Sequence, residues 1–172
     1  MKDDRKSVEW QVVACGMALA FLFVAGCASY PSHIATGMTR QDVITRFGPP
    51  AVEFNDGGGA TLIYSTAPMG QLAYAAQLDP SGRVVHVEQV LTLQNFANIR
   101  VNEWNQKEIL DHFGPAAQQR NIRGNRVWDY RYKEQGVYNS LFTVTFNDAG
   151  VVIKAENGPD PMFDGGHGHG HI

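Results

Sequence analysis

Two stretches of this sequence are alike: residues 41–51 read QDVITRFGPPA, and residues 107–117 read KEILDHFGPAA. Both have an acidic residue near the start, aliphatic residues in the middle and Phe-Gly-Pro towards the end. The likeness continues downstream, where LIY at 62–64 matches WDY at 128–130 and DPSG at 79–82 matches NDAG at 147–150. Because chance does not keep so many residue types in one order, the sequence predicts a duplicated unit.

Each copy begins with the pattern of a short helix. Thr39 and Asp42 in the first copy, and Asn105 and Glu108 in the second, have the spacing of a capping box. In this motif the first side chain accepts from an open backbone N–H, and the acidic residue lies at the positive end of the helix. We therefore expect helices that start directly after Thr39 and Asn105.

The apolar residues of these helices are four positions apart. Val43 and Phe47 share one helical face, as do Ile109 and Phe113, and a glycine and a proline follow each phenylalanine. Glycine suits the left-handed position after a helix, and proline cannot continue the helix. Such helices have only two to three turns and are marginal alone, so each must pack on a sheet.

Strand-like runs rich in bulky residues follow each helix. In the second copy Leu141, Thr143 and Thr145 alternate with Phe142, Val144 and Phe146, the period of a strand with one buried face. Tight turns are expected at 79–82 and 147–150, each ending in glycine. The predicted strands are 61–66, 71–78 and 83–91 in the first copy, and 127–132, 138–146 and 151–156 in the second.

These patterns predict an α+β fold of two tandem repeats. Each repeat has one or two short helices followed by a three- or four-stranded antiparallel sheet. The predicted boundaries are a signal peptide at 1–26, a first repeat at 27–92, a second repeat at 93–160 and a flexible Gly/His-rich tail at 161–172.

The N-terminus has the organisation of a secretory signal peptide. Basic residues in the first six positions precede an apolar run at 12–24, which is shorter than the about 20 residues of a membrane-spanning helix. Residues 24–27 read VAGC and resemble the lipobox of bacterial lipoproteins, which implies lipid attachment at Cys27 and cleavage before it. The alternative is an N-terminal anchor that is not cleaved. By resemblance to lipoprotein sorting rules, Ala28 implies the outer membrane.

The first repeat carries a longer signature. Residues 37–50 read GMTRQDVITRFGPP, which resembles the G-M-[ST]-x-x-[DEQ]-V-x-x-x-x-G-x-P pattern of the SmpA/OmlA (BamE-like) outer-membrane lipoproteins. The second copy has EWN at 103–105 in place of Gly-Met-Thr but keeps the Gly-Pro. Two units in tandem also resemble the architecture of the β-lactamase inhibitor protein. The resemblance implies a small α+β module on the periplasmic face of the outer membrane. It also implies that the module binds envelope proteins, β-barrel assembly components among them.

Candidate binding residues gather in the second repeat. Aromatic side chains are either core residues or anchors for a partner protein, and an exposed subset suits the second role. Arg120, Arg123 and Arg131 lie near them as a charged rim. The candidate protein-binding residues are Trp104, Trp128, Tyr130, Tyr132 and Arg126.

Three histidines of the tail, His167, His169 and His171, alternate with glycine. Imidazoles in this pattern are a candidate site for weak binding of Zn²⁺, Ni²⁺ or Cu²⁺, and the alternative is a disordered tail without a metal. No other cofactor is expected. The sequence has no nucleophile-elbow or phosphate-loop motif, so we expect no enzyme, and the net charge of −3 gives no reason to expect nucleic acid.

The sequence therefore predicts a lipid-anchored envelope protein that serves outer-membrane assembly or integrity by protein–protein binding. Two alternatives stay open. One is a periplasmic protein that inhibits or binds an enzyme, and the other is metal capture through the His-rich tail.

Overall fold

The computed structural model describes residues 31–55 and 57–163. The predicted signal peptide, Cys27 and the three histidines of the tail lie outside the described residues.

The strands pair into two four-stranded antiparallel sheets, which with a few short helices form an α+β fold. Strands follow the chain order in each sheet. The first sheet contains β1 (Val52–Asn55), β2 (Ala60–Ser65), β3 (Ala73–Leu78) and β4 (Val84–Gln89). The second contains β5 (Gln118–Ile122), β6 (Asn125–Glu134), β7 (Tyr138–Phe146) and β8 (Val152–Pro159). The helical elements are η1 (Pro31–His33), α2 (Arg40–Phe47), α3 (Leu93–Phe96) and α4 (Gln106–Phe113).

The capping boxes predicted for both longer helices are confirmed. In α2 the backbone N–H of Asp42 donates to Thr39 Oγ1 at 3.1 Å, and that of Thr39 donates to Asp42 Oδ2 at 2.9 Å. In α4 the equivalent bonds join Asn105 and Glu108 at 3.3 and 2.6 Å. These bonds satisfy donors that the first helical turn leaves open, so both helices start where local sequence dictates.

The glycines that end these helices have a positive φ, as predicted, but not a left-handed helical ψ. Gly48 has φ 81° and ψ −174°, and Gly114 has φ 74° and ψ −165°. This region is almost restricted to glycine. The backbone N–H groups of the two glycines bond to the carbonyls of Ile44 and Leu110, after which the chain turns into an extended conformation.

A tyrosine of each sheet holds the end of the preceding helix. The hydroxyl of Tyr64 in β2 donates to the carbonyl of Gly48 at 2.9 Å, and the hydroxyl of Tyr130 in β6 donates to that of Gly114 at 3.0 Å. Both pairs span 16 residues of sequence. The same contact therefore recurs at the ends of α2 and α4.

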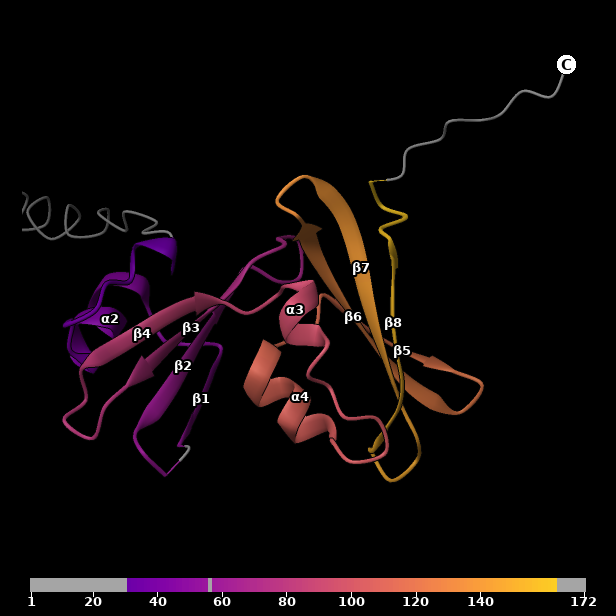
Figure 1. Cartoon of the computed structure of the whole chain (residues 1–172), viewed down its shortest axis with the longest axis horizontal. Helices are drawn as coiled ribbons and strands as arrows, with labels where there is room; N and C mark the ends of the chain where they lie inside the picture. The colour runs from indigo at the N-terminus through magenta and orange to yellow at the C-terminus, as the bar shows by residue number, and fades with distance from the viewer. Residues whose placement is uncertain (1–30, 56, 164–172) are drawn as a thin grey trace, which may run out of the picture.

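The elements stack in four layers, with α2 outermost, then β1–β4, then α3 with α4, then β5–β8 (Figure 1). One core lies between α2 and the first sheet and includes Val43, Leu62 and Leu78. The other includes Ile63 and Ala75 of the first sheet together with α3, α4 and the second sheet. The first sheet is thus covered on both faces.

The burial patterns of the strands follow from these layers. In β2 the four central residues 61–64 are all buried, because both faces of the first sheet are covered. In β7 buried and half-buried residues alternate, because only one face of the second sheet packs against helices. Two strands were not predicted: β1, and β5, whose five residues are all exposed.

Candidate protein-binding surface

Four aromatic residues that the sequence indicated as binding candidates lie in the core. None of their side chains exposes more than 8% of its surface, so the interpretation as exposed anchors is wrong for these four. Phe96 of α3 stacks on Phe142 of β7 with ring centroids 4.1 Å apart, and it also packs against Tyr130 and Tyr132. Trp128 packs against Phe146 of β7, and Trp104 packs against Phe113 of α4, in the same core. The buried candidates are Trp104, Trp128, Tyr130 and Tyr132.

The fifth candidate, Arg126, is exposed at the start of β6. Its Nη1 donates to Gln106 Oε1 at 2.7 Å, which ties the strand to the start of α4. Arg126 is therefore exposed, but its side chain lies on the inner face of the sheet, the face that also carries Trp128 and Tyr130.

The outer face of the second sheet is the open sheet face of this fold. No helix of the described part of the chain packs against it. Side chains that point to this face are half-buried on β7 and exposed on β8, where Lys154 opposes Thr145 and Glu156 opposes Thr143. An open sheet face lined by hydroxyls and charges presents a flat, polar area that a partner protein can cover. This outer face includes residues from all four strands, among them Gln118, Arg120, Asp129, Thr143, Thr145, Lys154 and Glu156.

An ion pair is held in a fixed geometry on the outer face. Arg120 donates to Asp129 through Nε at 2.7 Å and through Nη2 at 3.0 Å, and Thr143 Oγ1 donates to the same carboxylate at 2.9 Å. The Asp129 side chain is only 3% exposed, whereas Arg120 reaches the surface. The hydrogen bond to Asp129 raises the pKa of Arg120, so the guanidinium is a permanent, oriented positive charge.

A second ion pair lies within the second sheet, between β6 and the residue after β8. Nε of Arg131 in β6 lies 3.1 Å from Oδ2 of Asp160, and both side chains are almost fully buried. The Nη1 group of Arg131 donates at 3.3 Å to the carbonyl of Pro68, in the loop that connects β2 with β3. Gln71 of the same loop donates to Asn139 at 3.0 Å. The loop of the first sheet is therefore fixed against the upper end of the second.

A shallow cavity of about 500 Å³ lies at this upper end. Glu134 Oε2 accepts hydrogen bonds from Ser140 at 2.9 Å and from Asn157 at 3.2 Å, and Asn157 Oδ1 accepts from the Tyr132 hydroxyl at 2.8 Å. Burial raises the pKa of Tyr132 to about 12, so its hydroxyl stays protonated and keeps donating at neutral pH. The arrangement orients polar groups towards solvent and suits hydrogen bonding. Exposed rings of Tyr138 and Phe163 border it.

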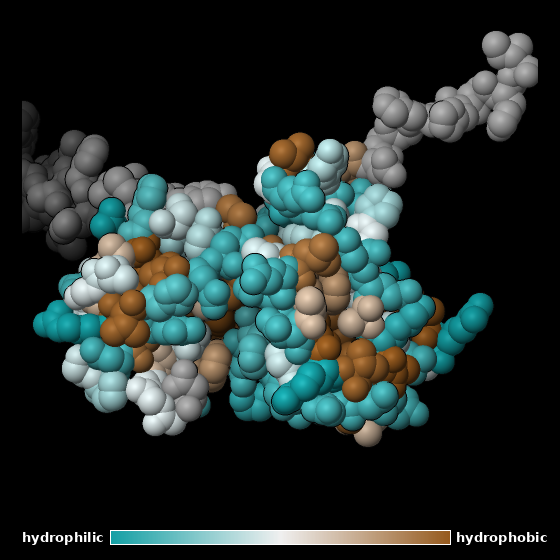
Figure 2. Space-filling model, viewed as in Figure 1, coloured by the Kyte–Doolittle hydropathy of each residue, from teal (hydrophilic) through white to brown (hydrophobic). Residues whose placement is uncertain are grey.

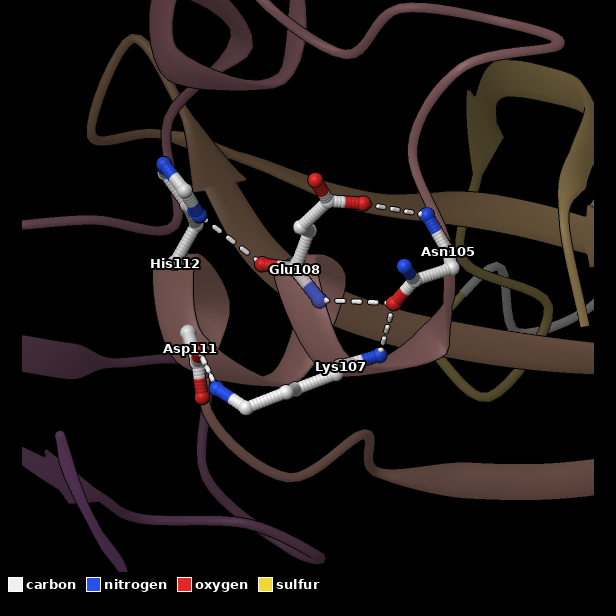
Figure 3. Close-up of polar contacts among 5 residues, drawn as sticks. All are labelled: Asn105, Lys107, Glu108, Asp111 and His112. Atoms are coloured by element: carbon white, nitrogen blue, oxygen red, sulfur yellow. Dashed lines mark hydrogen bonds and ion pairs between the residues drawn. The ribbon is translucent and has the colours of Figure 1, made fainter.

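The polar side chains at the start of α4 have structural roles (Figure 3). Glu108 closes the capping box, and a ring nitrogen of His112 lies 2.8 Å from the Glu108 carbonyl. Lys107 and Asp111 pair on the exposed side of the helix. Each group is engaged within one turn of its own helix, so the cluster stabilises α4 instead of facing a ligand.

The described residues offer neither a metal site nor a membrane-spanning helix. Among residues 31–55 and 57–163, no group of three or more His, Cys, Asp or Glu side chains is placed to hold a metal ion. In the described part of the chain, no helix has the length and apolar character needed to cross a bilayer. The metal-site prediction for His167, His169 and His171 lies outside these residues and stays a prediction.

The acidic members of the outer face and the cavity, Asp129, Glu134 and Asp160, were not predicted from the sequence. One signal for Asp129 exists, because an acid between Trp128 and Tyr130 in an apolar strand must find a partner if it is buried. Comparison of the chain with protein-family models found no match, and no curated protein matches it significantly.

Proposed function

We propose that this chain is a lipid-anchored protein of the outer membrane that lies on its periplasmic face and acts by binding other envelope proteins in outer-membrane assembly or integrity. The VAGC motif at 24–27 supports the anchor, since a small-residue segment before Cys27 follows an apolar run of signal-peptide length. Diacylglycerol on Cys27 and a further acyl chain hold such a protein firmly, because one chain alone binds membranes only reversibly.

The observation that carries the binding role is the open outer face of the second sheet. Both faces of the first sheet and the inner face of the second are covered by helices of the chain itself. On the remaining face, the buried carboxylate of Asp129 holds the guanidinium of Arg120 in a fixed orientation. Pre-oriented charges lower the entropic cost of association, which favours a surface built for a protein partner.

The tandem-repeat interpretation, with repeats at 27–92 and 93–160, is supported by contacts that recur in both halves. Each half has a helix with a capping box, a glycine with positive φ and a tyrosine that bonds to its carbonyl. Isolated β-bridges join Thr39 to Arg83 and Asn105 to Val151 at matching places. We propose that the two halves are copies of one BamE-like unit, each a helical segment followed by a four-stranded sheet.

A second candidate function is the binding of a single periplasmic enzyme, as an inhibitor does. The fixed Arg120–Asp129 pair favours it, because a rigid guanidinium suits a carboxylate on a partner surface. The third alternative, metal capture, rests on the tail alone. Removal of residues 164–172 should then abolish Zn²⁺, Ni²⁺ or Cu²⁺ binding measured by calorimetry.

In-cell crosslinking tests the proposed function. A photo-crosslinking amino acid replaces Lys154, which is exposed on the outer face, and in a matched control it replaces Val85, which is exposed on β4 of the first sheet. Crosslinks from position 154 to outer-membrane assembly proteins, absent from position 85, support the proposal. Recovery of one soluble enzyme from position 154 favours the inhibitor role. Equal products from both positions contradict a role for the outer face.

A further inference from the structure

Exposed apolar side chains gather at the upper end of the second sheet. Val137 and Tyr138 lie at the turn from β6 to β7, and Met162 and Phe163 follow β8. Met69, in the loop fixed against this end, completes what we term the apolar tip, whose members are between 46% and 70% exposed. Figure 2 shows hydrophobic side chains that protrude above the β6–β7 turn.

Hydrogen bonds and a shared cavity hold the parts of the apolar tip together. Tyr138 and Phe163 border the same cavity, and the backbone N–H of Asp160 donates to the carbonyl of Asn139 at 3.1 Å. Gln71 joins the loop of Met69 to Asn139. Segments that are distant in the sequence therefore expose their apolar side chains at one end of the molecule.

The chain enters the fold on the same long edge. Figure 1 shows η1, the loop between β2 and β3, the β6–β7 turn and the end of β8 along the upper edge of the molecule. Only three residues separate Cys27 from Pro31, the first described residue. An extended chain spans at most about 3.5 Å per residue, so a lipid on Cys27 is attached within about 14 Å of Pro31.

We propose that the apolar tip inserts into the surface of the bilayer that holds the lipid anchor. This inference rests on the proposed anchor at Cys27. A spacer this short keeps the upper edge against the membrane, where the apolar side chains replace contact with water by contact with lipid. A tyrosine ring suits the interfacial region, because it is apolar with a polar end. The exposed ammonium of Lys133, 3.4 Å from the Val137 carbonyl, adds a positive charge for anionic headgroups.

Fluorescence quenching by bilayer lipid tests the proposal. The lipidated protein carries Val137→Cys labelled with a polarity-sensitive fluorophore, in vesicles of phosphatidylethanolamine and phosphatidylglycerol with brominated acyl chains. The lipid thioether on Cys27 does not react with the label, and Cys15 leaves with the signal peptide. The matched control is Val101→Cys. Val101 is 42% exposed in the loop between α3 and α4, which lies on the opposite edge (Figure 1).

The expected result is quenching at position 137 that exceeds that at position 101 by about twofold or more, because only the tip enters the acyl region. Thermal melts of both variants verify that the fold is kept. Equal quenching at the two positions, with lipid on Cys27 shown by mass spectrometry, overturns the insertion but leaves the proposed anchor intact. A mature chain without lipid on Cys27 overturns both.

Discussion

Gly114, which ends α4, lies against Ile63 of β2, so that a β-carbon at position 114 would be 2.8 Å from Ile63 Cγ2. The glycine follows α4, and the isoleucine belongs to the first sheet. The contact is therefore part of the seam between α4 and the first sheet, and it leaves no room for a side chain. Gly48, at the matching place in the first unit, has open space around it.

Gly114→Ala should destabilise the protein more than Gly48→Ala. Both substitutions force alanine into a backbone region with positive φ, which costs about 1–3 kcal/mol. Only the change at 114 adds a steric clash across the seam, for which overpacking costs suggest about 1–3 kcal/mol more. Urea unfolding of the two variants measures the difference. Equal losses would mean that the units are packed less tightly than the structure describes.

Removal of the tyrosine hydroxyls should have unequal effects. Tyr130→Phe leaves a buried carbonyl of Gly114 without its phenolic donor and should lower the free energy of unfolding by about 1–3 kcal/mol. Tyr64→Phe removes the equivalent bond at a partly buried site, so a loss of about 0.5–1.5 kcal/mol is expected. Chemical denaturation of the two variants checks the order, which a larger effect at Tyr64 would contradict.

The ion pair between Arg131 and Asp160 should be sensitive to truncation. Asp160→Ala leaves the buried Arg131 without its counter-charge, for which a loss of about 3–5 kcal/mol is expected. The control is Glu103→Ala in the exposed pair with Arg100, where a change within about 1 kcal/mol is expected. Thermal or urea unfolding gives both values. Similar small losses would show that Arg131 is solvated in solution.

Alkaline titration should distinguish three buried tyrosines from the other tyrosines of the chain by their raised pKa values. Burial raises the pKa of Tyr64 and Tyr132 to about 12 and raises that of Tyr130 as well. The folded state favours the neutral phenol. The stability that this preference supports is therefore fully present at pH values below the ordinary tyrosine pKa of 10.0, and it is lost as the pH rises towards 12.

Absorbance at 295 nm measures the ionisation. In the native protein, these three tyrosines should ionise only at high pH or on unfolding. In denaturant, all six should ionise together. One native transition that includes every tyrosine at the ordinary value would contradict the burial of Tyr64, Tyr130 and Tyr132.

Local features of the fold were predictable because they depend on residues close in the chain. The capping boxes join residues three positions apart, and the turns at 79–82 and 147–150 close through bonds from Gly82 to Asp79 and from Gly150 to Asn147, each 2.9 Å. Strand β5 was not predicted, since QQRNI has no apolar alternation and the strand is held by backbone pairing with β6. In β1, apolar and polar residues do alternate (VEFN), but four residues are too few for this alternation to predict a strand clearly.

Candidate binding residues were harder to assign, because residue type does not specify exposure. Trp128 and Tyr132 are residue types that often anchor a partner protein, but both are buried. Phe96 of α3, 36 residues earlier in the chain, packs against the Tyr132 ring, and Phe146 of β7 packs against Trp128. Arg120 was predicted as part of a charged rim, but its fixed geometry depends on Asp129, which is buried beneath it and which the sequence did not single out.

The sequence by itself determined two short capped helices, their glycine ends, the turns and most strands, since hydrogen bonds within a few residues fix these features. The tertiary structure alone decided which sheet faces are covered, because α3 and α4 lie between the sheets. It also decided which acids are paired, because the partners of Asp129 and Asp160 come from other strands. It also decided that Met69, Val137 and Phe163 meet at one end. Such contacts join segments that are tens of residues apart in the chain. Burial of apolar surface selects their arrangement, and the conformational preferences of neighbouring residues do not.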